Sequence, residues 1–365
     1  MTREKPPSST VLAQTQESFV SHKPNRRRIL ATGLGGAVVG LLLPTPFTPL
    51  SAQDERPSLS FFRIGTGPSA ESLYSLGTAI SAGISRPPGS SPCDEGGICG
   101  VPGLIAVAQT RAGSIPNIRD IRDGVLESAL VHADMAYWAF TGGGPFADEA
   151  SVPDLRVIAD LIPVSLHIVV RADSGINSIR DLKGRTISLG ARGAGTGTIV
   201  NTLLRLNGLN LQDIKPVYLR PGPAADHLIT GVIDAFFEMG AAPIEAISEL
   251  QQEETIKLLP IDGAAQQTLK GFFPFLSAGT IPSQVYRKIE EITTVKLGVK
   301  WVVKEKMDAV LIQNITRALW QSSTADLFNH NNPGLTFPTV EEGRPKGRVP
   351  VHPGAQAYYD TIHSS

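Results

Sequence analysis

Apolar runs of strand length alternate with segments of helical periodicity along most of the chain. Short runs rich in β-branched and aromatic side chains predict strands, whereas apolar residues three and four apart predict the buried face of a helix. The runs that predict strands are Ser58–Ile64, Leu104–Ala108, Leu155–Ala159, His167–Arg171, Thr186–Leu189, Pro216–Leu219, Asp234–Phe237, Ile256–Leu259 and Val295–Lys304.

The segments between these runs predict helices. They are a helix carrying Leu73, Leu76, Ile80 and Ile84 on one face, then Asn117–Leu130, Ser178–Leu182, Thr198–Leu206, Ala224–Thr230, Pro243–Leu250, Asp308–Trp320 and a last helix containing Tyr358 and Tyr359. Alternating strands and helices are typical of an α/β fold with mainly parallel sheets. We expect a chain that leaves one lobe, builds a second and returns: lobe 1 from residues 53–165 and 262–365, lobe 2 from 166–261, with a ligand cleft and a hinge between them.

The N-terminal segment predicts export. Arg26-Arg27-Arg28 precedes an apolar run, Ile29–Leu43, which is followed by prolines and by the small residues Ser51-Ala52. A basic stretch, a short apolar run and a small-residue cleavage site are typical of a signal peptide, here residues 1–52, and the paired arginines resemble a twin-arginine signal. A signal anchor or a basic amphipathic tail is the alternative. The expected location is the periplasm.

The charge balance excludes a nucleic-acid partner. With 33 basic and 34 acidic residues the chain carries no basic excess, which nucleic-acid binding would require. The composition, 41% apolar and 18% charged, is that of an ordinary globular protein.

Two cysteines, Cys93 and Cys99, flank a short loop. In an oxidising compartment such a pair predicts a disulfide. A metal site is the rival, but no second pair of Cys or His residues lies nearby in the sequence.

A glycine-rich turn, Gly193–Thr198, lies where a predicted strand leads into a predicted helix. Such a turn directs backbone N–H groups and the positive end of the helix dipole at one point, which favours an anion. A dinucleotide fits poorly, because Thr198 stands at the third glycine of the fingerprint and Arg220 replaces the acidic ribose ligand. NADP binding and a purely structural turn remain alternatives to a small carboxylate held by Thr196 and Thr198.

A second glycine turn, Gly65–Ser69, lies in the other predicted lobe, so a ligand held by both turns would draw the lobes together. No catalytic motif is present, and we predict no enzyme activity, no cofactor and no bound metal. His167 lies in an apolar strand and is expected to be a hydrogen-bonded core or hinge residue. His132, beside Asp134, is expected at the cleft.

Several short segments together resemble the TAXI family, the solute receptors of tripartite ATP-independent periplasmic (TRAP) transporters. The resemblance covers residues 61–359 and is carried by Ile64–Gly67, Gly113–Asn117, Leu155–Ala159, His167–Arg171, Asp181–Gly184, Gly195–Thr198, Gly231–Phe237, Thr280–Pro282 and His352–Ala355. The cystine loop with Gly100–Ile105 resembles a subgroup of that family.

The resemblance implies a type II periplasmic-binding-protein fold, a small carboxylate ligand and membrane subunits driven by an ion gradient. It implies a ligand site formed by Thr66, Gly67, Ser69, Tyr74 and Asn117 from lobe 1 and by Gly195, Thr196, Gly197 and Thr198 from lobe 2. The chain departs from the family pattern at Glu71, His132 and Ile162-Pro163-Val164. Glu71 in the cleft would repel a second ligand carboxylate; it is otherwise an acid at a helix start. A ligand-sensing subunit of a signalling system and an exported NADP-dependent oxidoreductase remain the other candidate functions.

Overall fold

The computed structural model describes residues 59–69, 72–192, 194–253, 256–332 and 334–363. The predicted signal peptide, residues 1–52, lies outside these ranges. Most of the strands form one sheet in the order β4-β1-β5-β12-β6-β9-β7-β8, with β10 paired to β6 and β11 to β12. These strands are β1 (Ser60–Gly65), β4 (Leu104–Gln109), β5 (Ser128–His132), β6 (Leu155–Arg171), β7 (Thr186–Ser188), β8 (Lys215–Val217), β9 (Ala235–Gly240), β10 (Ile256–Leu258), β11 (Ser277–Ile281) and β12 (Ile292–Lys304).

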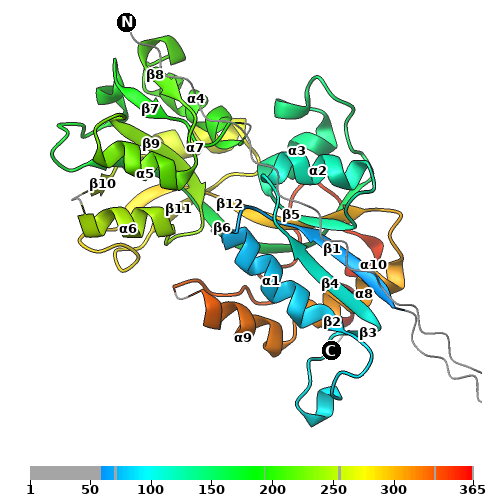
Figure 1. The fold of residues 1–365 in the computed structure, drawn as a ribbon. Helices are drawn as coiled ribbons and strands as arrows, with labels where there is room; N and C mark the ends of the chain where they lie inside the picture. The colour runs from blue at the N-terminus through cyan, green and yellow to red at the C-terminus, as the bar shows by residue number, and fades with distance from the viewer. Residues whose placement is uncertain (1–58, 70–71, 193, 254–255, 333, 364–365) are drawn as a thin grey trace, which may run out of the picture. The chain divides into compact units, whose positions relative to one another are not determined.

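Two long strands, β6 and β12, lie in the middle of the sheet, between β4, β1 and β5 on one side and β9, β7 and β8 on the other (Figure 1). Up to Ser165, β6 pairs antiparallel with β12, and from Ser165 to Val170 it pairs with β9. β12 pairs with β11 through its first residues and with β5 through Val299–Val303. Parallel pairs lie on both sides, β1 with β4 and β5, and β7 with β8 and β9. The predicted α/β fold is confirmed, but the prediction of a mainly parallel sheet is wrong. The sheet is mixed, because β6 and β12 pair antiparallel with each other and with β5, β9, β10 and β11.

The two strands predicted at Leu155–Ala159 and His167–Arg171 are halves of the continuous strand β6. Pro163 lies between them and is exposed. A proline lacks the N–H that a ladder uses, so it is tolerated in a strand beside an irregularity. Here Pro163 pairs with Gly298 on β12, where the register shifts between Gly298 and Lys300. The sequence therefore marked a local irregularity and not the end of a strand.

Helices cover the sheet and bury its apolar side chains. They are α1 (Ser72–Ile84), α2 (Ser114–Arg122), α3 (Ala133–Thr141), α4 (Thr196–Leu206), α5 (Pro221–Ile229), α6 (Glu245–Glu253), α7 (Gly263–Phe272), α8 (Ala309–Leu319), α9 (Ser322–Asn331) and α10 (Pro353–His363). A separate two-stranded sheet joins β2 (Ser85–Arg86) to β3 (Val101–Pro102). The predicted apolar face Leu73, Leu76, Ile80 and Ile84 of α1 is buried. Ser178–Leu182, predicted as a helix, forms a 3-10 helix over Ile179–Leu182.

The predicted helix Asn117–Leu130 is wrong in its second half. Helix α2 ends at Arg122, Gly124 takes a positive φ of 76°, and the chain continues into strand β5. Val125, which a continued helix would place on the same buried face as Ile118 and Ile121, is 44% exposed. The short apolar run Ala129–Val131 satisfies helical spacing with the residues before it, but a run this short fits a buried strand equally well.

A buried histidine lies where β6 changes partner. His167 Nδ1 lies 2.9 Å from the Ser165 carbonyl oxygen, and its Nε2 lies 3.0 Å from Tyr286 Oη. The Ile244 N–H donates to the same Tyr286 oxygen at 2.8 Å. These contacts fit a neutral ring that donates through Nδ1 and accepts from the tyrosine hydroxyl. Burial lowers the pKa of His167 to about 4, which agrees with the neutral form.

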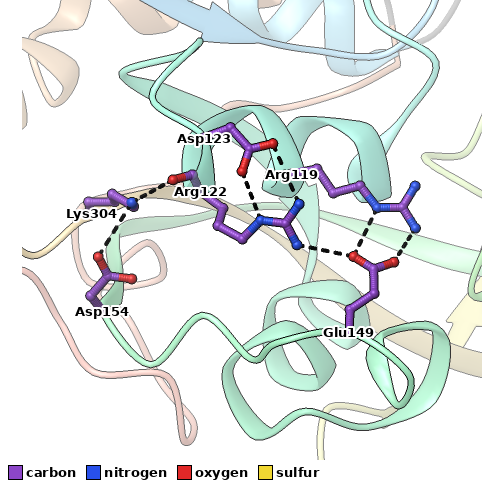
Figure 2. A network of polar contacts seen from close by, with 6 residues as sticks. All are labelled: Arg119, Arg122, Asp123, Glu149, Asp154 and Lys304. Atoms are coloured by element: carbon purple, nitrogen blue, oxygen red, sulfur yellow. Dashed lines mark hydrogen bonds and ion pairs between the residues drawn. The ribbon is translucent and has the colours of Figure 1, made fainter.

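A network of ion pairs and hydrogen bonds holds the loop between α3 and β6 in place (Figure 2). Glu149 accepts from Arg119 and from Arg122, both near the end of α2. Lys304 Nζ, at the end of β12, donates to the Arg122 carbonyl oxygen at 2.7 Å and lies 3.7 Å from Asp154 Oδ2. The network joins α2, this loop and the end of β12 on the exposed surface.

Replacing Tyr286 by phenylalanine is expected to lower the free energy of unfolding by about 1–3 kcal/mol, because it leaves the Ile244 N–H and His167 Nε2 unsatisfied. Urea unfolding of the variant measures this change. Tyr358→Phe is the matched control, since no hydrogen bond of the Tyr358 hydroxyl is present among the described residues; it is expected to change stability by less than about 0.5 kcal/mol. Equal losses in both variants would contradict the role given to the Tyr286 hydroxyl.

Candidate ligand-binding site

The glycine turn lies at the N-terminus of α4, directly after strand β7. Gly190 takes a positive φ of 84°, and a Cβ atom there would lie 3.1 Å from Thr196 Cβ, so the turn needs glycine at this position. Gly195 and Thr196 are buried, whereas Thr198 is exposed. Gly193 lies outside the described residues. The first N–H groups of α4 and its dipole give this end of the helix a preference for negative charge.

Gly195 lies against α3. A Cβ atom at Gly195 would collide with Asp134 Oδ2 and would lie 2.6 Å from Met135 Cε. The φ of Gly195 is −62°, a value open to any residue. A side chain at Gly195 would have to displace the ends of these two side chains, so close packing, and not the backbone conformation, favours glycine here. Through this contact, the N-terminal turns of α3 and α4 meet.

Asp134 brings an uncompensated carboxylate to this contact. Its side chain is 1% exposed, and Oδ1 accepts a hydrogen bond of 2.7 Å from the Met135 N–H. No Lys or Arg among the described residues forms an ion pair with it. Burial raises the pKa of Asp134 to about 7, and the backbone hydrogen bond opposes that rise only in part. Near neutral pH the carboxyl group thus exists in both charged and neutral forms.

His132 is the last residue of β5 and directly precedes α3. Its N–H donates to Ser114 Oγ at 3.1 Å, which links the end of β5 to the first turn of α2. Burial lowers the pKa of the His132 imidazole to about 4, so the ring is neutral at neutral pH. His132 lies two residues before Asp134 in the chain, but its neutral ring supplies no positive charge to that carboxylate.

The turn Gly65–Ser69 is held by Asn117. The Asn117 Nδ2 group donates to the Thr66 carbonyl at 2.9 Å and to the Leu130 carbonyl at 3.3 Å, so it ties α2 to the ends of β1 and β5. Asn117 Oδ1 is buried and has no hydrogen-bond partner among the described residues. The Thr66 hydroxyl donates to the Gln109 carbonyl at 2.8 Å in a fully buried position. The Thr66 hydroxyl is therefore already hydrogen-bonded to the end of β4.

The structure brings the predicted site residues together in two groups. One contains Thr66, Gly67 and Asn117, and the other contains Gly195 and Thr196 with Asp134. Gly67 is buried, Tyr74 is half-buried in the first turn of α1, Gly197 is half-buried, and Ser69 and Thr198 are exposed. Glu71 lies outside the described residues. The assignment of these residues to a ligand site stays a prediction.

The sequence reasoning did not assign Asp134 to the site. An acidic residue in the first turn of a helix is ordinarily a solvated charge favoured by the dipole. Its contact with Gly195 joins two segments far apart in the chain. The only signal was its position beside His132, directly after a buried apolar run.

The predicted disulfide is present. Cys93 and Cys99 are bonded, with their Cα atoms 4.9 Å apart. Among the described residues no three His, Cys, Asp or Glu side chains gather in a way that would hold a metal ion. In the same part of the chain no helix is long and apolar enough to cross a membrane.

Comparison of the fold with solved structures gives the class first. PhnD1 from Prochlorococcus marinus, solved in complex with methylphosphonate, matches with a TM-score of 0.50 at 10% identity over 84% of this chain and 99% of that chain. The alkanesulfonate-binding protein SsuA from Xanthomonas axonopodis pv. citri, bound to MOPS, matches at 0.49 and 16% identity over 84% and 93%. A TctC solute binding protein from Polaromonas matches at 0.46 and 17% identity over 85% and 99%. The fold is that of the two-lobed periplasmic binding proteins.

The family follows from the sequence. The NMT1-like family matches residues 64–361, most of the chain, and the protein belongs to that family.

Replacing Asp134 by asparagine is expected to stabilise the unliganded protein above about pH 7. A carboxyl group whose pKa rises from 3.8 unfolded to about 7 folded stabilises the fold below pH 3.8. That contribution is lost as the pH rises through about 7. Above this pH folding must either keep the group protonated or bury its charge, and both cost free energy. Thermal unfolding between pH 5 and 8 measures the difference, which should shrink toward low pH.

Asp148→Asn, an exposed substitution on the loop after α3, is the matched control and should change the melting temperature little. A variant Asp134→Asn that melts below the original chain at pH 8 would contradict the uncompensated carboxylate. His132 and His167, whose pKa values burial lowers to about 4, destabilise the fold as the pH falls below 6.5. Comparison of the two chains at each pH cancels that common effect.

Proposed function

We propose that this protein is an extracytoplasmic solute-binding receptor that captures a small carboxylate and delivers it to transporter membrane subunits. The observation that carries the proposal is the glycine turn at the N-terminus of α4, which meets the N-terminal turn of α3 at Gly195. The ligand carboxylate binds to the first N–H groups of α4 and to the hydroxyls of Thr196 and Thr198. Membership of the NMT1-like family and the binding-protein fold support this function.

The finer assignment rests on the resemblance to the TAXI family. It makes the membrane partner a TRAP transporter, the location periplasmic after removal of residues 1–52, and the protein a non-enzyme. In the proposal residues 166–261 form one lobe and residues 53–165 with 262–365 the other. The change of β6 from β12 to β9 at Ser165 supports that division. Thr66, Gly67, Ser69, Glu71, Tyr74, Asn117 and His132 contribute from the first lobe.

The contact between Asp134 and Gly195 shapes how the ligand binds. A charged Asp134 repels a carboxylate at the end of α4, whereas a neutral Asp134 can donate a hydrogen bond to it. The ligand therefore binds to the form in which Asp134 carries its proton. Binding of the acid is coupled to this proton.

A thermal-shift screen of the protein without residues 1–52 tests the proposal. Amino acids, dicarboxylates and 2-oxo acids form the panel, and at least one acid is expected to raise the melting temperature, because a ligand that binds only the folded state stabilises it by RT ln(1 + [L]/Kd). A panel in which no acid shifts the melting temperature would overturn the proposal.

Thr196→Val is expected to weaken binding of that acid about tenfold, the loss of a hydrogen bond to a charged group, with a small effect on the unliganded melting temperature. Thr202→Val is the matched control on the same helix, where the hydroxyl donates to the Thr198 carbonyl at 3.3 Å. Calorimetric titration measures both affinities. Equal weakening by the two substitutions would remove Thr196 from the site.

The affinity is expected to fall about tenfold between pH 6 and pH 8, because a group with a pKa near 7 is about nine-tenths protonated at the first pH and about one-tenth at the second. Titration of the same acid across this range measures the slope. Asp134→Asn should bind with little dependence on pH. A slope that survives the substitution would assign the proton to another group.

A further inference from the structure

A pocket lies beside the first turn of α3, where Ala133 and Tyr137 are part of its lining. It encloses about 340 Å³ and is bounded by α3, by the segment before β11, by β12 and by the segment after Arg344. Its walls are Ala133, Tyr137, Asp160, Pro274, Phe275, Leu276, Ser277, Gly298, Lys300, Lys346, Gly347, Arg348 and Val349. The volume is within the range of pockets that hold small molecules.

Positive charge predominates in this pocket. Three of its side chains are cationic and one is acidic. Lys300 is 7% exposed; its Nζ atom donates to Asp160 Oδ1 and, at 2.9 Å, to the Lys346 carbonyl oxygen. Asp160 is thus engaged by Lys300, and its second oxygen accepts from the Lys346 N–H at 3.0 Å. The side chains of Lys346 and Arg348 form no ion pair within 4 Å among the described residues, and Glu342 is the acid whose charge interacts with Lys346.

Other parts of the lining are aromatic and apolar. The rings of Tyr137 and Phe275 lie 5.7 Å apart, and Ala133, Leu276 and Val349 complete these parts. A pocket with cationic and aromatic parts matches a molecule with an anionic end and a flat apolar body.

Gly298 keeps the pocket open. A Cβ atom added there meets no atom within 4 Å, and its φ lies outside the left-handed region. Neither backbone conformation nor packing therefore requires glycine at this strand position, although a glycine inside a strand weakens it and is found where a ligand approaches the backbone closely. The space that a side chain would occupy is left free for a ligand.

We propose that this pocket binds a small aromatic carboxylate, with its carboxylate on Lys346 and Arg348 and its ring against Tyr137 and Phe275. The site is separate from the turn at Gly195, and the inference does not depend on the proposed function. It gives the protein a second ligand, held beside the first turn of α3.

Calorimetric titration with 3-phenylpropanoate tests the inference. The acid is expected to bind, while 3-phenylpropan-1-ol, of the same shape without the charge, binds at least about tenfold more weakly. Gly298→Leu fills the pocket and should abolish binding while leaving the melting temperature of the free protein nearly unchanged. Thr196→Val should leave this affinity as it is, which separates the pocket from the turn at Gly195.

The exposed cations supply a second test that does not alter the strand. Arg348→Gln and Lys346→Gln are each expected to weaken binding of 3-phenylpropanoate about tenfold, the low end for hydrogen bonds to charged groups. Lys306→Gln, an exposed substitution with the same change in charge, is the control and should have no effect. Absence of binding, or binding that survives both Gly298→Leu and Arg348→Gln, would overturn the inference.

Discussion

The pairing of β6 with β12 is the constraint on which the rest of the structure depends. Each strand is long enough to run through both halves of the sheet, and most of the residues that pair the two strands are buried. β12 pairs with β5, and β6 pairs with β9. These pairings fix the positions of the helices that follow the paired strands. The contact between α3 and α4 is one result, since α3 follows β5 and α4 follows β7, the partner of β9.

That contact places two preferences against each other. The end of α4 favours negative charge, and Asp134 offers one, but the carboxylate is enclosed where water cannot solvate it. Burial raises the pKa of Asp134 to about 7, and backbone hydrogen bonds at Met135 and at Asp134 itself oppose that rise only in part. A buried group without a charged partner is costly to the fold, and such groups concentrate at functional sites. The buried carboxyl group is thus one of the observations that support the proposed ligand site.

Much of the fold was predictable because its signals are local. Strand-length runs and helical spacing located most of the elements, and the Gly195–Thr198 turn was recognisable as the start of a helix. The helix predicted over Asn117–Leu130 failed because Gly124 turns the chain and the residues after it satisfy both helical and strand patterns. Two features were not predictable, since each is set by a neighbour distant in the chain. They are the close packing that favours glycine at position 195 and the buried position of Asp134. The open space beside Gly298 is likewise set by residues distant in the chain.

The close approach at Gly195 also bears on kinetics. Because the Asp134 carboxylate lies directly on the Gly195 backbone, a ligand bound at this end of α4, as proposed, would require α3 and α4 to separate first. In that proposal binding follows an opening step, and the observed association rate would reach a plateau at high ligand concentration, set by the rate of opening. The speed of binding would then be set by the separation of α3 from α4.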